Sequence, residues 1–537
     1  MAIRPLSPLE VISRFPRHDY SLAGILESRT SVVGAHEFVV FEDRGRSYAQ
    51  IRDEVLRAAA MLAGRGVKPG ERVGIMSQNH PSTVVLLLAL ARLGAIMVPV
   101  NPDYGADEAK YVLTHAGVMG VISSPAALDI VREATADLRP APWLMLNCRG
   151  EAPLAVFGEA IARTGAAAPA NSGTADSTCL FIYTSGTTGF PKGVMHSQRN
   201  VILAGEGFVE RMYIQPEERL LAVLPLFHIN AILYSMAGAL AAGATLILAP
   251  KFSASTFWTV AARTRATLVN TIAAVTAVLM RRPRSEFVAG HVLEKLYGAP
   301  FTTETFEVFR NEFHVPHLIE GYGMSEIPGA LSNPFPGPHK IGSMGPPCRH
   351  PDPSVRLAEL KIVDDQGNEV PEGTTGELVC RTPMVMQGYF RDAGLTRAAF
   401  RDGWFLTGDL ARRDADGWFW FVARKKDIIR KRGENISGAE LDRVIGAHPD
   451  VLEAAAIAVP AELGEDEILV AAVPRPGAAL TAQSIADWAA QHLAPIKVPR
   501  YVAIVAELPH TPTHRVAKFK LKGDKSLLEQ AVDLAKQ

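Results

Sequence analysis

Hydrophobic residues recur along most of this chain with spacings that alternate between those of helices and those of buried strands. Residues 48–64 have the apolar spacing of an amphipathic helix, and residues 72–77 form a short apolar run typical of a strand. A helix over 83–93 and a strand over 95–100 repeat this unit. Alternation of this kind predicts parallel sheets in an α/β fold. Further predicted elements are a helix over 110–116 and strands over 118–123, 179–183, 220–224, 245–248, 267–271 and 317–319.

Three segments depart from this alternation. Residues 140–177 are rich in Ala, Pro, Gly and Thr, which predicts a connecting loop. Short strands at 360–363 and 376–381 flank the turn sequence Asp364-Asp365-Gln366-Gly367, and they predict a small β-rich subdomain. Beyond Arg424 the chain carries a charge cluster of its own and a βαβ-like pattern that continues to Val505.

Composition and charge narrow the class of protein. The 537 residues are 48% hydrophobic and 21% charged, which suits a globular enzyme of roughly 3–4 domains with a large core. The formal net charge of −1 predicts no general affinity for nucleic acid or anionic membranes. The most hydrophobic run, 84–100, is interrupted by Arg92 and Gly94, so we interpret it as a buried helix and strand and expect no integral membrane association.

The cysteines and the N-terminus indicate the compartment. Four cysteines without CxxC or metal-binding spacing favour a reduced environment. The first residues, Met-Ala-Ile-Arg-Pro-Leu-Ser-Pro, lack the apolar core of a signal peptide. We therefore expect a cytoplasmic protein.

The most informative stretch is residues 184–193, Thr-Ser-Gly-Thr-Thr-Gly-Phe-Pro-Lys-Gly, which follows a predicted strand. Its glycines let the backbone bend tightly and approach a ligand, and its N–H groups and hydroxyls can form an anion-binding nest. Lys192 adds a positive charge for phosphate. The order Pro-Lys-Gly differs from the Gly-Lys-Ser/Thr of a Walker P-loop. The structural alternative is a surface turn of small polar residues.

Further stretches carry residues suited to chemistry. The stretch 224–230, Leu-Pro-Leu-Phe-His-Ile-Asn, follows a strand and precedes a long apolar helix, and 320–326, Glu-Gly-Tyr-Gly-Met-Ser-Glu, follows the strand at 317–319. Asp409, within Thr-Gly-Asp, and Arg424 come later. Taken singly these residues have structural interpretations, since His228 could be a satisfied core histidine and Glu326 could cap a helix that follows it.

In this order and at these separations, the four motifs resemble those of the adenylate-forming superfamily, which includes acyl-CoA synthetases, peptide-synthetase adenylation domains and luciferases. The resemblance covers nearly the whole chain. It implies a large N-terminal domain, 1–424, of two α/β subdomains plus the small β-rich subdomain. It also implies a small mobile α+β C-terminal domain, 425–537, that turns about a hinge near Lys426. The alternative for 424–427 is a solvated run of charges.

The resemblance implies an acid–CoA ligase that uses ATP and Mg²⁺, with CoA as co-substrate. A carboxylic acid would react with ATP to give an acyl-adenylate and pyrophosphate, and the CoA thiol would then displace AMP. Because the carboxylate and the triphosphate repel each other, the site needs cations and N–H donors around the α-phosphate. Rotation of the C-terminal domain would present a different face for each half-reaction.

The same resemblance implies nucleotide-binding roles for residues of this sequence. Tyr322 would stack on the adenine, and Ser325 would approach the α-phosphate. Glu326 would ligate Mg²⁺, which suits one carboxylate combined with phosphate oxygens and water. Asp409 would accept hydrogen bonds from the ribose hydroxyls, with Arg424 nearby. The remaining residues are Thr184, Ser185, Gly186, Thr187, Thr188 and Lys192 at the phosphates, and Gly298, Ala299, Pro300, Gly321, Gly323 and Met324 around the adenine.

One loop of the C-terminal domain departs from the family pattern. The loop that guards the thiol tunnel usually reads Ser-Gly-Gly-Glu-Asn, whereas residues 431–435 here read Lys-Arg-Gly-Glu-Asn. Gly433 is kept and is assigned to CoA binding. Arg432 replaces the first glycine, and it either meets a phosphate of CoA or faces solvent.

A second departure concerns the catalytic lysine of adenylation, which the family carries in a Thr-Pro-x-Gly-Lys string. Residues 511–518 here read Thr-Pro-Thr-His-Arg-Val-Ala-Lys, so Arg515 stands in the lysine's place and Lys518 follows three residues later. Arginine keeps the charge, but its reach and shape differ from those of lysine. The choice between Arg515 and Lys518 stays open; a primary ammonium is the group the family uses, which favours Lys518. Both departures loosely resemble the carnitine- and crotonobetaine-CoA ligases.

The resemblance also locates the pocket for the acid, and it assigns His228 both to its wall and to the catalytic residues. Asn230 and Asn270 are polar where a fatty-acid tunnel would be apolar, and a buried amide needs a partner. That favours a short or polar-substituted acid; alternatively, one or both amides bond the local backbone. The predicted wall residues are His228, Asn230, Asn270, Ala299, Gly323, Met324, Ile327 and Pro328.

Two other functions fit parts of the sequence. A standalone adenylation enzyme would load a carrier protein in place of CoA, although the sequence contains no Gly-x-Asp-Ser carrier motif. A non-catalytic relative would only bind nucleotide, and the absent lysine at 515 is its one support. The expected partners are a small carboxylic acid, ATP and CoA, and a homodimer is left open.

Overall fold

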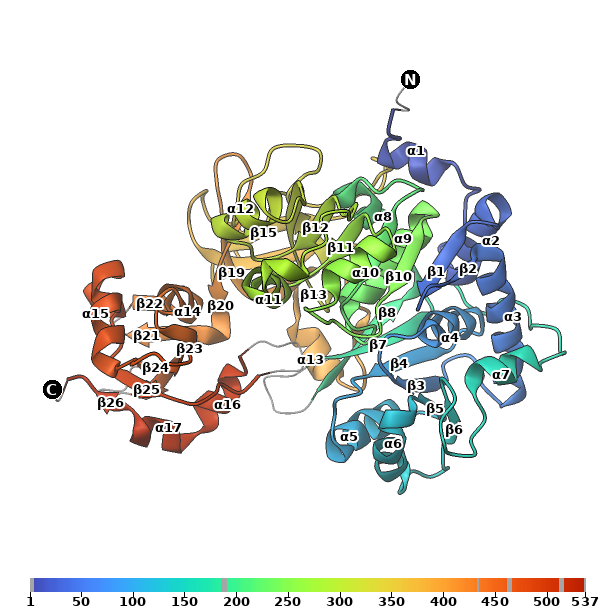
Figure 1. Cartoon of the computed structure of the whole chain (residues 1–537), viewed down its shortest axis with the longest axis horizontal. Helices are drawn as coiled ribbons and strands as arrows, with labels where there is room; N and C mark the ends of the chain where they lie inside the picture. Colours follow the sequence, from blue (N-terminus) through green and yellow to red (C-terminus); the bar gives the residue numbers. More distant parts are fainter. Residues whose placement is uncertain (1–3, 185–190, 432–433, 461–465, 511–515, 536–537) are drawn as a thin grey trace. The chain divides into compact units, whose positions relative to one another are not determined.

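The computed structural model describes residues 4–184, 191–431, 434–460, 466–510 and 516–535. The chain divides into two compact units, one formed by Met1–Leu360 with Cys380–Phe405 and the other by Lys361–Val379 with Leu406–Gln537 (Figure 1). Each is described by itself below. In the described ranges, no helix is both long and apolar enough to cross a membrane.

The first sheet of the larger unit has seven strands in the order β17-β8-β7-β4-β3-β5-β6. The five strands from β7 to β6 run parallel, whereas β8 and β17 are antiparallel to their neighbours. Parallel strands are buried on both faces, which explains their continuous apolar runs. The strands are β3 Arg72–Met76, β4 Ile96–Val100, β5 Gly120–Ser123, β6 Trp143–Leu146, β7 Thr178–Thr184, β8 Lys192–Ser197 and β17 Gly388–Tyr389.

The second sheet has eight strands in the order β14-β13-β12-β11-β9-β10-β1-β2. The six strands from β13 to β1 are parallel, and only the edge strands β14 and β2 are antiparallel. The strands are β1 Glu37–Phe41, β2 Arg44–Ser47, β9 Arg219–Ala222, β10 Thr245–Leu248, β11 Leu268–Asn270, β12 Lys295–Gly298, β13 His317–Met324 and β14 Ile327–Ser332. The predicted parallel α/β architecture is confirmed.

Several helices of this unit begin at a residue whose side chain caps the first turn. Ser47 accepts a hydrogen bond from the backbone of Gln50, whose side chain bonds the Ser47 N–H in return, so the helix predicted over 48–64 forms with those bounds. The helices are α1 Pro8–Ser13, α2 Leu22–Val33, α3 Tyr48–Gly64, α4 Pro81–Arg92, α5 Ala106–Ala116, α6 Leu128–Thr135, α7 Phe157–Ala162, α8 Gln198–Met212, α9 Ala237–Ala242, α10 Phe257–Arg263, α11 Ala273–Arg281, α12 Thr303–Asn311 and α13 Ala393–Ala398.

The prediction of a loop over 140–177 is wrong in part. This segment contains β6 and α7, and β6 adds the outermost strand to the first sheet beside β5. The indole of Trp143 covers Gly120, where a Cβ would lie 2.0 Å from the ring. Such a contact between distant residues supports a strand that the local composition disfavours.

The sequence 320–326 also differs from expectation. The strand predicted over 317–319 continues to Met324, and Glu326 is followed by β14, so its interpretation as a helix cap is wrong. Gly321 and Gly323 lie inside β13, and each gives space to another group. A Cβ at Gly321 would lie 2.2 Å from the Tyr297 hydroxyl, and one at Gly323 would lie 2.5 Å from the backbone nitrogen of Gly329.

The helix expected after His228 begins with an unusual turn. Residues Asn230–Met236 form a π-helix, η2, that continues into α9. A π-helix, with i→i+5 hydrogen bonds, is rare and frequently lies at a functional site. Ser235 of this π-helix accepts a hydrogen bond from Asn270 at the end of β11, and Tyr234 packs against Tyr297 of β12.

The second unit begins with the predicted β-rich segment. A five-stranded sheet has the order β15-β16-β19-β18, with β20 paired to β19, and the division between the units passes through β15, β16 and β19. A hairpin of β21 and β22 follows it. The strands are β15 Glu359–Val363, β16 Gly376–Arg381, β18 Phe400–Arg401, β19 Trp404–Arg413, β20 Phe419–Arg424, β21 Ile428–Lys431 and β22 Glu434–Ser437.

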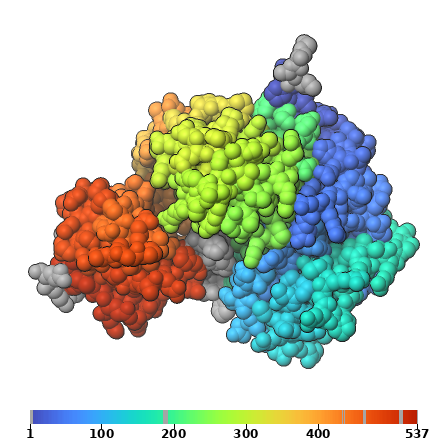
Figure 2. Space-filling view, in the orientation of Figure 1, coloured from blue at the N-terminus to red at the C-terminus, as the bar shows by residue number. Residues whose placement is uncertain are grey.

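The C-terminal part of this unit is an α+β body of its own, coloured red in Figure 2. Its sheet has the order β23-β24-β25-β26, and β24, α15 and β25 form the predicted βαβ unit. Alternate residues of β24 enter two cores, Ile468 and Val470 on the side of α14 and α15, Leu469 and Ala471 on the side of α16 and α17. The elements are α14 Gly438–Gly446, β23 Val451–Pro460, β24 Asp466–Pro474, α15 Ala482–His492, β25 Tyr501–Ile504, α16 Lys518–Gly523, α17 Lys525–Gln530 and β26 Val532–Asp533.

Candidate active site

Glu326 lies in the two-residue turn between β13 and β14, where Met324 pairs with Ile327. It is 8% exposed, and its Oε1 accepts a hydrogen bond of 2.8 Å from the hydroxyl of Tyr389 on β17. Burial and the neighbouring carboxylate both raise the pKa of Tyr389, so the phenol stays a donor at neutral pH. In the described residues no donor bonds Oε2. The carboxylate is therefore oriented and keeps an oxygen for a hard cation.

The backbone of the turn is held from β8. His196 Nε2 donates to the carbonyl oxygen of Ser325 at 2.8 Å, while Nδ1 lies 3.4 Å from the Asn200 amide. Burial lowers the pKa of His196 to about 4, so the ring is neutral and can donate from one nitrogen only. The carbonyl of Glu326 accepts from the backbone N–H of Met386 at 2.8 Å. Sequence reasoning missed His196, because one polar residue in a short strand that also contains Lys192 and Ser197 gives no local signal.

The two residues that flank the predicted phosphate-binding loop pair with each other: Thr184 at the end of β7 lies opposite Lys192 at the start of β8. Lys192 Nζ lies 5.5 Å from the centroid of the Tyr389 ring. One tyrosine thus contacts both the candidate phosphate-binding cation and, through its hydroxyl, the candidate metal ligand. Ser185, Gly186, Thr187 and Thr188 lie outside the described residues.

The segment predicted to frame the adenine follows β12 and is fixed by a buried carboxylate. Glu320 is 0% exposed; Oε1 accepts from the Phe301 N–H at 3.0 Å, and Oε2 accepts from the Gly342 N–H at 2.9 Å and from His339 at 3.1 Å. The first of these bonds positions the run Gly298, Ala299 and Pro300. Tyr322, the predicted stacking residue, is half-buried on β13. Glu320 was not predicted as a site residue, because in the sequence it only begins the motif.

The predicted wall of the acid pocket contains two amides with unfilled bonding capacity. Asn270, 1% exposed at the end of β11, donates from Nδ2 to Ser235 Oγ of η2 at 2.8 Å. Its Oδ1 is buried and has no hydrogen-bond partner in the described ranges, and the same holds for Asn230 Oδ1. The amide of Asn270 therefore bonds a side chain of η2 and not the local backbone.

The other predicted wall residues lie on several elements of this unit. Ile327 is 0% exposed and packs in an apolar cluster with Val194 and Phe405, which Met324 borders. His228 is half-buried, and its ring centroid lies 4.4 Å from that of Phe227. Ala299, Gly323 and Pro328 flank the same two strand ends, β12 and the β13–β14 hairpin.

In the second unit, Asp409 and Arg424 are paired across β19 and β20. Arg424 Nε lies 2.9 Å from Oδ1 of the buried Asp409. Gly408 before it has φ +68°, a left-handed conformation that glycine adopts without strain, and the Asp409 N–H donates to Thr407 Oγ1 at 3.0 Å. The structure thus brings together the two residues predicted for the ribose and keeps the carboxylate beside a cation.

The charged residues at the predicted hinge are not a uniform solvated run. Lys425 Nζ forms ion pairs with Asp365 at 2.9 Å and with Glu377 at 3.1 Å. The next carbonyl, that of Lys426, accepts from Lys522 Nζ of α16 at 3.1 Å. Lys426 itself has an exposed side chain, and partial desolvation of its ammonium group lowers its pKa.

Lys518, one of the two candidates for the adenylation cation, is engaged within the C-terminal domain. Its Nζ lies 2.5 Å from Oδ2 of Asp442 on α14, and the other oxygen of Asp442 accepts from the Ala456 N–H at 2.6 Å. Burial raises the pKa of Asp442, and Lys518 opposes that rise. Arg515, the other candidate, and Gly433 lie outside the described residues.

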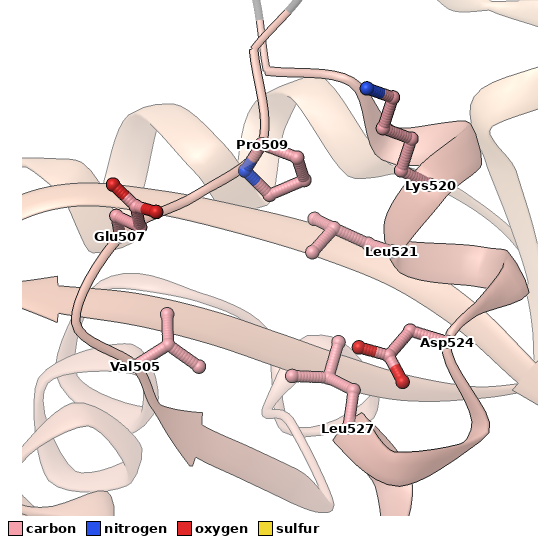
Figure 3. Close-up of a pocket in the computed structure, with 7 residues that line it drawn as sticks. All are labelled: Val505, Glu507, Pro509, Lys520, Leu521, Asp524 and Leu527. Atoms are coloured by element: carbon pink, nitrogen blue, oxygen red, sulfur yellow. The ribbon is translucent and has the colours of Figure 1, made fainter.

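The C-terminal domain also contains a cavity of about 310 Å³ between the end of β25 and α16–α17. In Figure 3 the side chains of Val505, Leu521 and Leu527 point into it, and Lys520 stands at its rim. None of the predicted site residues lines it, so it is separate from the residues described above.

Two family models match successive parts of this chain. Residues 26–390 match the family model described as AMP-binding enzyme, and residues 440–515 match its C-terminal domain. Sulfoacetate–CoA ligase of Cupriavidus necator is 32% identical over 93% of this chain and 97% of its own length. Crotonobetaine/carnitine–CoA ligase of Salmonella typhi is 28% identical over 93% and 97%. The crystal structure of ATP-bound MatB from Rhodopseudomonas palustris superposes with a TM-score of 0.83 at 27% identity, over 94% of this chain and 98% of that one.

The chain therefore belongs to the AMP-binding enzyme family. It is an adenylate-forming acid–CoA ligase that uses ATP, Mg²⁺ and CoA, and the predicted family, fold class and enzyme activity are confirmed. Among the described residues there is no group of three or more His, Cys, Asp or Glu side chains that could hold a metal. A lone carboxylate such as Glu326 fits Mg²⁺, which takes its other ligands from phosphates and water.

Removing the hydroxyl of Tyr389 should weaken the use of Mg²⁺. In Tyr389→Phe the ring beside Lys192 remains, but Glu326 loses the hydrogen bond that orients it. We expect the Mg²⁺ concentration for half-maximal ATP–pyrophosphate exchange to rise about 10-fold, as is usual when a partner of a metal ligand is lost. Glu326→Gln should lose exchange at every Mg²⁺ concentration.

The matched control is Tyr183→Phe, because the hydroxyl of Tyr183 bonds His115 at 2.8 Å and does not touch Glu326. Its Mg²⁺ dependence should equal that of the wild type. An unchanged Mg²⁺ dependence in Tyr389→Phe would show that this tyrosine only packs.

A pair of substitutions can separate the structural and catalytic roles of Lys518. Lys518→Met leaves the carboxylate of Asp442 without its cation, which should lower the free energy of unfolding by about 1–3 kcal/mol. Lys518→Met combined with Asp442→Asn should restore stability in thermal melts. If pyrophosphate exchange returns with stability, Lys518 is structural and the catalytic role passes to Arg515, which is the result we expect. A stable double variant that still forms adenylate slowly would assign the role to Lys518.

Proposed function

We propose that this acid–CoA ligase activates a short, polar-substituted carboxylic acid. The observation that carries the proposal is the buried amide of Asn270, which is anchored to Ser235 and leaves Oδ1 without a partner. An unfilled polar atom in a core costs about 1–3 kcal/mol, so it persists where a ligand or water completes its bonds. An alkyl chain could not do so.

The substrates named for the similar proteins do not show which polar substituent the acid of this enzyme carries. Sulfoacetate carries an anionic sulfonate, whereas crotonobetaine and carnitine carry a quaternary ammonium. Enzymes of this family therefore accept short acids with opposite charges, and the preference of this chain has to come from its own pocket residues.

The proposed roles of the N-terminal residues follow from their contacts. Glu326, oriented by Tyr389, would hold Mg²⁺, which neutralises the phosphate oxygens when it is bound. Lys192 would add a second positive charge at the leaving pyrophosphate, and the Ser325 backbone is kept in place by His196. These residues concentrate positive charge where the carboxylate has to approach the triphosphate.

Fewer described residues support the proposed nucleotide and CoA roles of the second unit than support those of the larger unit. Asp409 would accept from the ribose hydroxyls, because Arg424 lies beside its carboxylate and the bond from the Asp409 N–H to Thr407 fixes its backbone. The four cysteines form no disulfide with one another, which supports a reducing, cytoplasmic location. We favour CoA over a carrier protein as acceptor, because the similar proteins are CoA ligases.

We also propose that the domain boundary lies between residues 424 and 425, with the hinge at Lys426. Lys425 is anchored to Asp365 and Glu377 of the β-rich segment, whereas the Lys426 carbonyl is bonded from α16 of the C-terminal domain. The contacts thus change from one body to the other within a single peptide. Hinges of this kind absorb large changes of φ and ψ at one or two residues.

The products test the reaction directly. With an accepted acid and CoA, the enzyme should release AMP and pyrophosphate in equal amounts, with no turnover when Mg²⁺ is removed. Product analysis by chromatography measures both nucleotides. ADP with inorganic phosphate would contradict the proposal, because a different phosphorus would have been attacked.

Proline at the hinge should separate the two half-reactions. Lys426→Pro fixes φ near −65° and hinders the rotation. We expect ATP–pyrophosphate exchange to persist and acyl transfer to CoA to fall at least about 10-fold. Lys426→Ala removes the charge but keeps the backbone free, so it should retain both half-reactions. Equal loss of both in the proline variant would indicate misfolding, and wild-type rates in both would refute the hinge.

A further inference from the structure

Arg211 is a buried cation that the site described above does not use. It lies in the last turn of α8 and is 3% exposed. Its guanidinium carbon lies 5.3 Å from the centroid of the Phe208 ring, 5.0 Å from that of Tyr234 and 5.9 Å from that of Tyr297. Three aromatic side chains therefore exclude water from it.

One edge of this guanidinium has no partner. Nη1 donates to the carbonyl oxygen of Gly329 at 3.0 Å and lies 3.7 Å from Cys348 Sγ. Nε and Nη2 are fully buried and bond to no described residue. These two N–H groups are the parallel donors of the fork with which arginine takes both oxygens of a carboxylate.

Other buried cations of this unit are satisfied. Arg29 donates from the corresponding Nε and Nη2 to the carbonyl of Ala241, at 3.3 and 2.9 Å. Lys295 forms an ion pair with Glu218 at 2.8 Å. Arg211 has no such counter-ion in the described part of the chain.

Local features do not supply the missing negative charge. The C-terminal end of α8 and the aromatic faces favour a cation at this position, but neither bonds Nε or Nη2. Burial raises the pKa of the Cys348 thiol, so the sulfur remains neutral beside Arg211. Among the described residues, the unfilled edge of Arg211 therefore has no anionic partner.

Arg211 packs against a residue that adjoins the predicted wall of the acid pocket. Gly329 follows Pro328, and a Cβ at Gly329 would lie 2.2 Å from Arg211 Nη1. A Cβ at Gly323 would lie 2.7 Å from the hydroxyl of Tyr234. Tyr234 and the Asn270 partner Ser235 are neighbours on η2, so the guanidinium and the amide share one helix turn as their support.

We propose that Arg211 binds a second anionic group on the acid, a carboxylate or a sulfonate, through Nε and Nη2. The substrate class is then a short acid with two negative charges, of which one carboxylate is activated and the other group is held by Arg211. This inference rests on the proposed function and deepens it. The anion would accept two charge-assisted hydrogen bonds in a site lined by aromatic rings, where such bonds are strong.

The test compares dianionic acids with neutral counterparts of similar length. Malonate, succinate and sulfoacetate are compared with propanoate and butanoate in CoA-dependent AMP release. The wild type should have the higher kcat/KM for at least one of the dianionic acids. Arg211→Met, which keeps the volume but not the charge, should lower the ratio of kcat/KM for that acid to that for a neutral acid by about 100-fold. Arg211→Lys, which keeps the charge but not the fork, should lie between the two.

Arg29→Met is the matched control, because it removes a buried arginine whose donors already have a partner. Its ratio should stay at the wild-type value even if its stability falls, and thermal melts report folding for every variant. An unchanged ratio in Arg211→Met, or a wild-type preference for the neutral acids, would overturn the inference and leave the proposed ligase function standing. Failure of the wild type to release AMP with any acid of the panel would overturn both.

Discussion

The hydrogen bonds of the buried Glu320 carboxylate underlie the geometry of this site. A carboxylate removed from water is retained only where donors replace its hydration. Here two backbone N–H groups, of Phe301 and Gly342, and the ring of His339 supply them. They join the segment after β12, the strand β13 and the loop at 339–342. Because β13 is fixed at this point, its far end brings Tyr322, Ser325 and Glu326 to defined positions.

The other end of β13 is held by neutral hydrogen-bond donors, so that no charged side chain is needed to hold it in place. His196 is uncharged at neutral pH and bonds the Ser325 carbonyl, and Tyr389 is a protonated phenol that bonds Glu326. A cation in either place would neutralise Glu326 and compete with the Mg²⁺ proposed to bind there. The positive charge nearby comes instead from Lys192, at the start of β8 and next to the predicted phosphate-binding loop. The residues that position this part of the chain are thus neutral, whereas the residues proposed to bind phosphate and metal are charged.

The sequence predicted the sheets well because parallel strands, buried on both faces, are continuous apolar runs. The helix over 48–64 and the strands over 245–248 and 376–381 have the bounds expected. It failed over 140–177, where β6 depends on Trp143 packing against Gly120, a contact between residues far apart in the sequence. It also ended the strand predicted over 317–319 too early, because glycine in the sequence does not show whether it serves a turn or, as at Gly321 and Gly323 within β13, a close approach of another group.

The candidate site was predicted through motifs, and the residues that orient it were not. Tyr389 belongs to a two-residue strand, and His196 is one polar position in a short strand, so neither has a local signal. Arg211 follows Glu210 near the end of an amphipathic helix, where a cation normally faces solvent and interacts with the helix dipole. Its burial depends on three rings from α8, η2 and β12, which only the assembled fold brings together.

The unfilled polar atoms of the N-terminal unit have a common consequence for selectivity. Asn230, Asn270 and Arg211 lie on or beside η2, and each has a buried atom without a partner in the described residues. A site of this kind rejects an apolar acid more strongly than it attracts a polar one, because the apolar acid leaves these atoms unpaired and dry. Discrimination against a ligand that leaves buried polar groups unpaired is far larger than discrimination against a ligand that lacks one methylene group. The proposed pocket would therefore discriminate among acids of equal length without any change in the residues proposed to hold ATP.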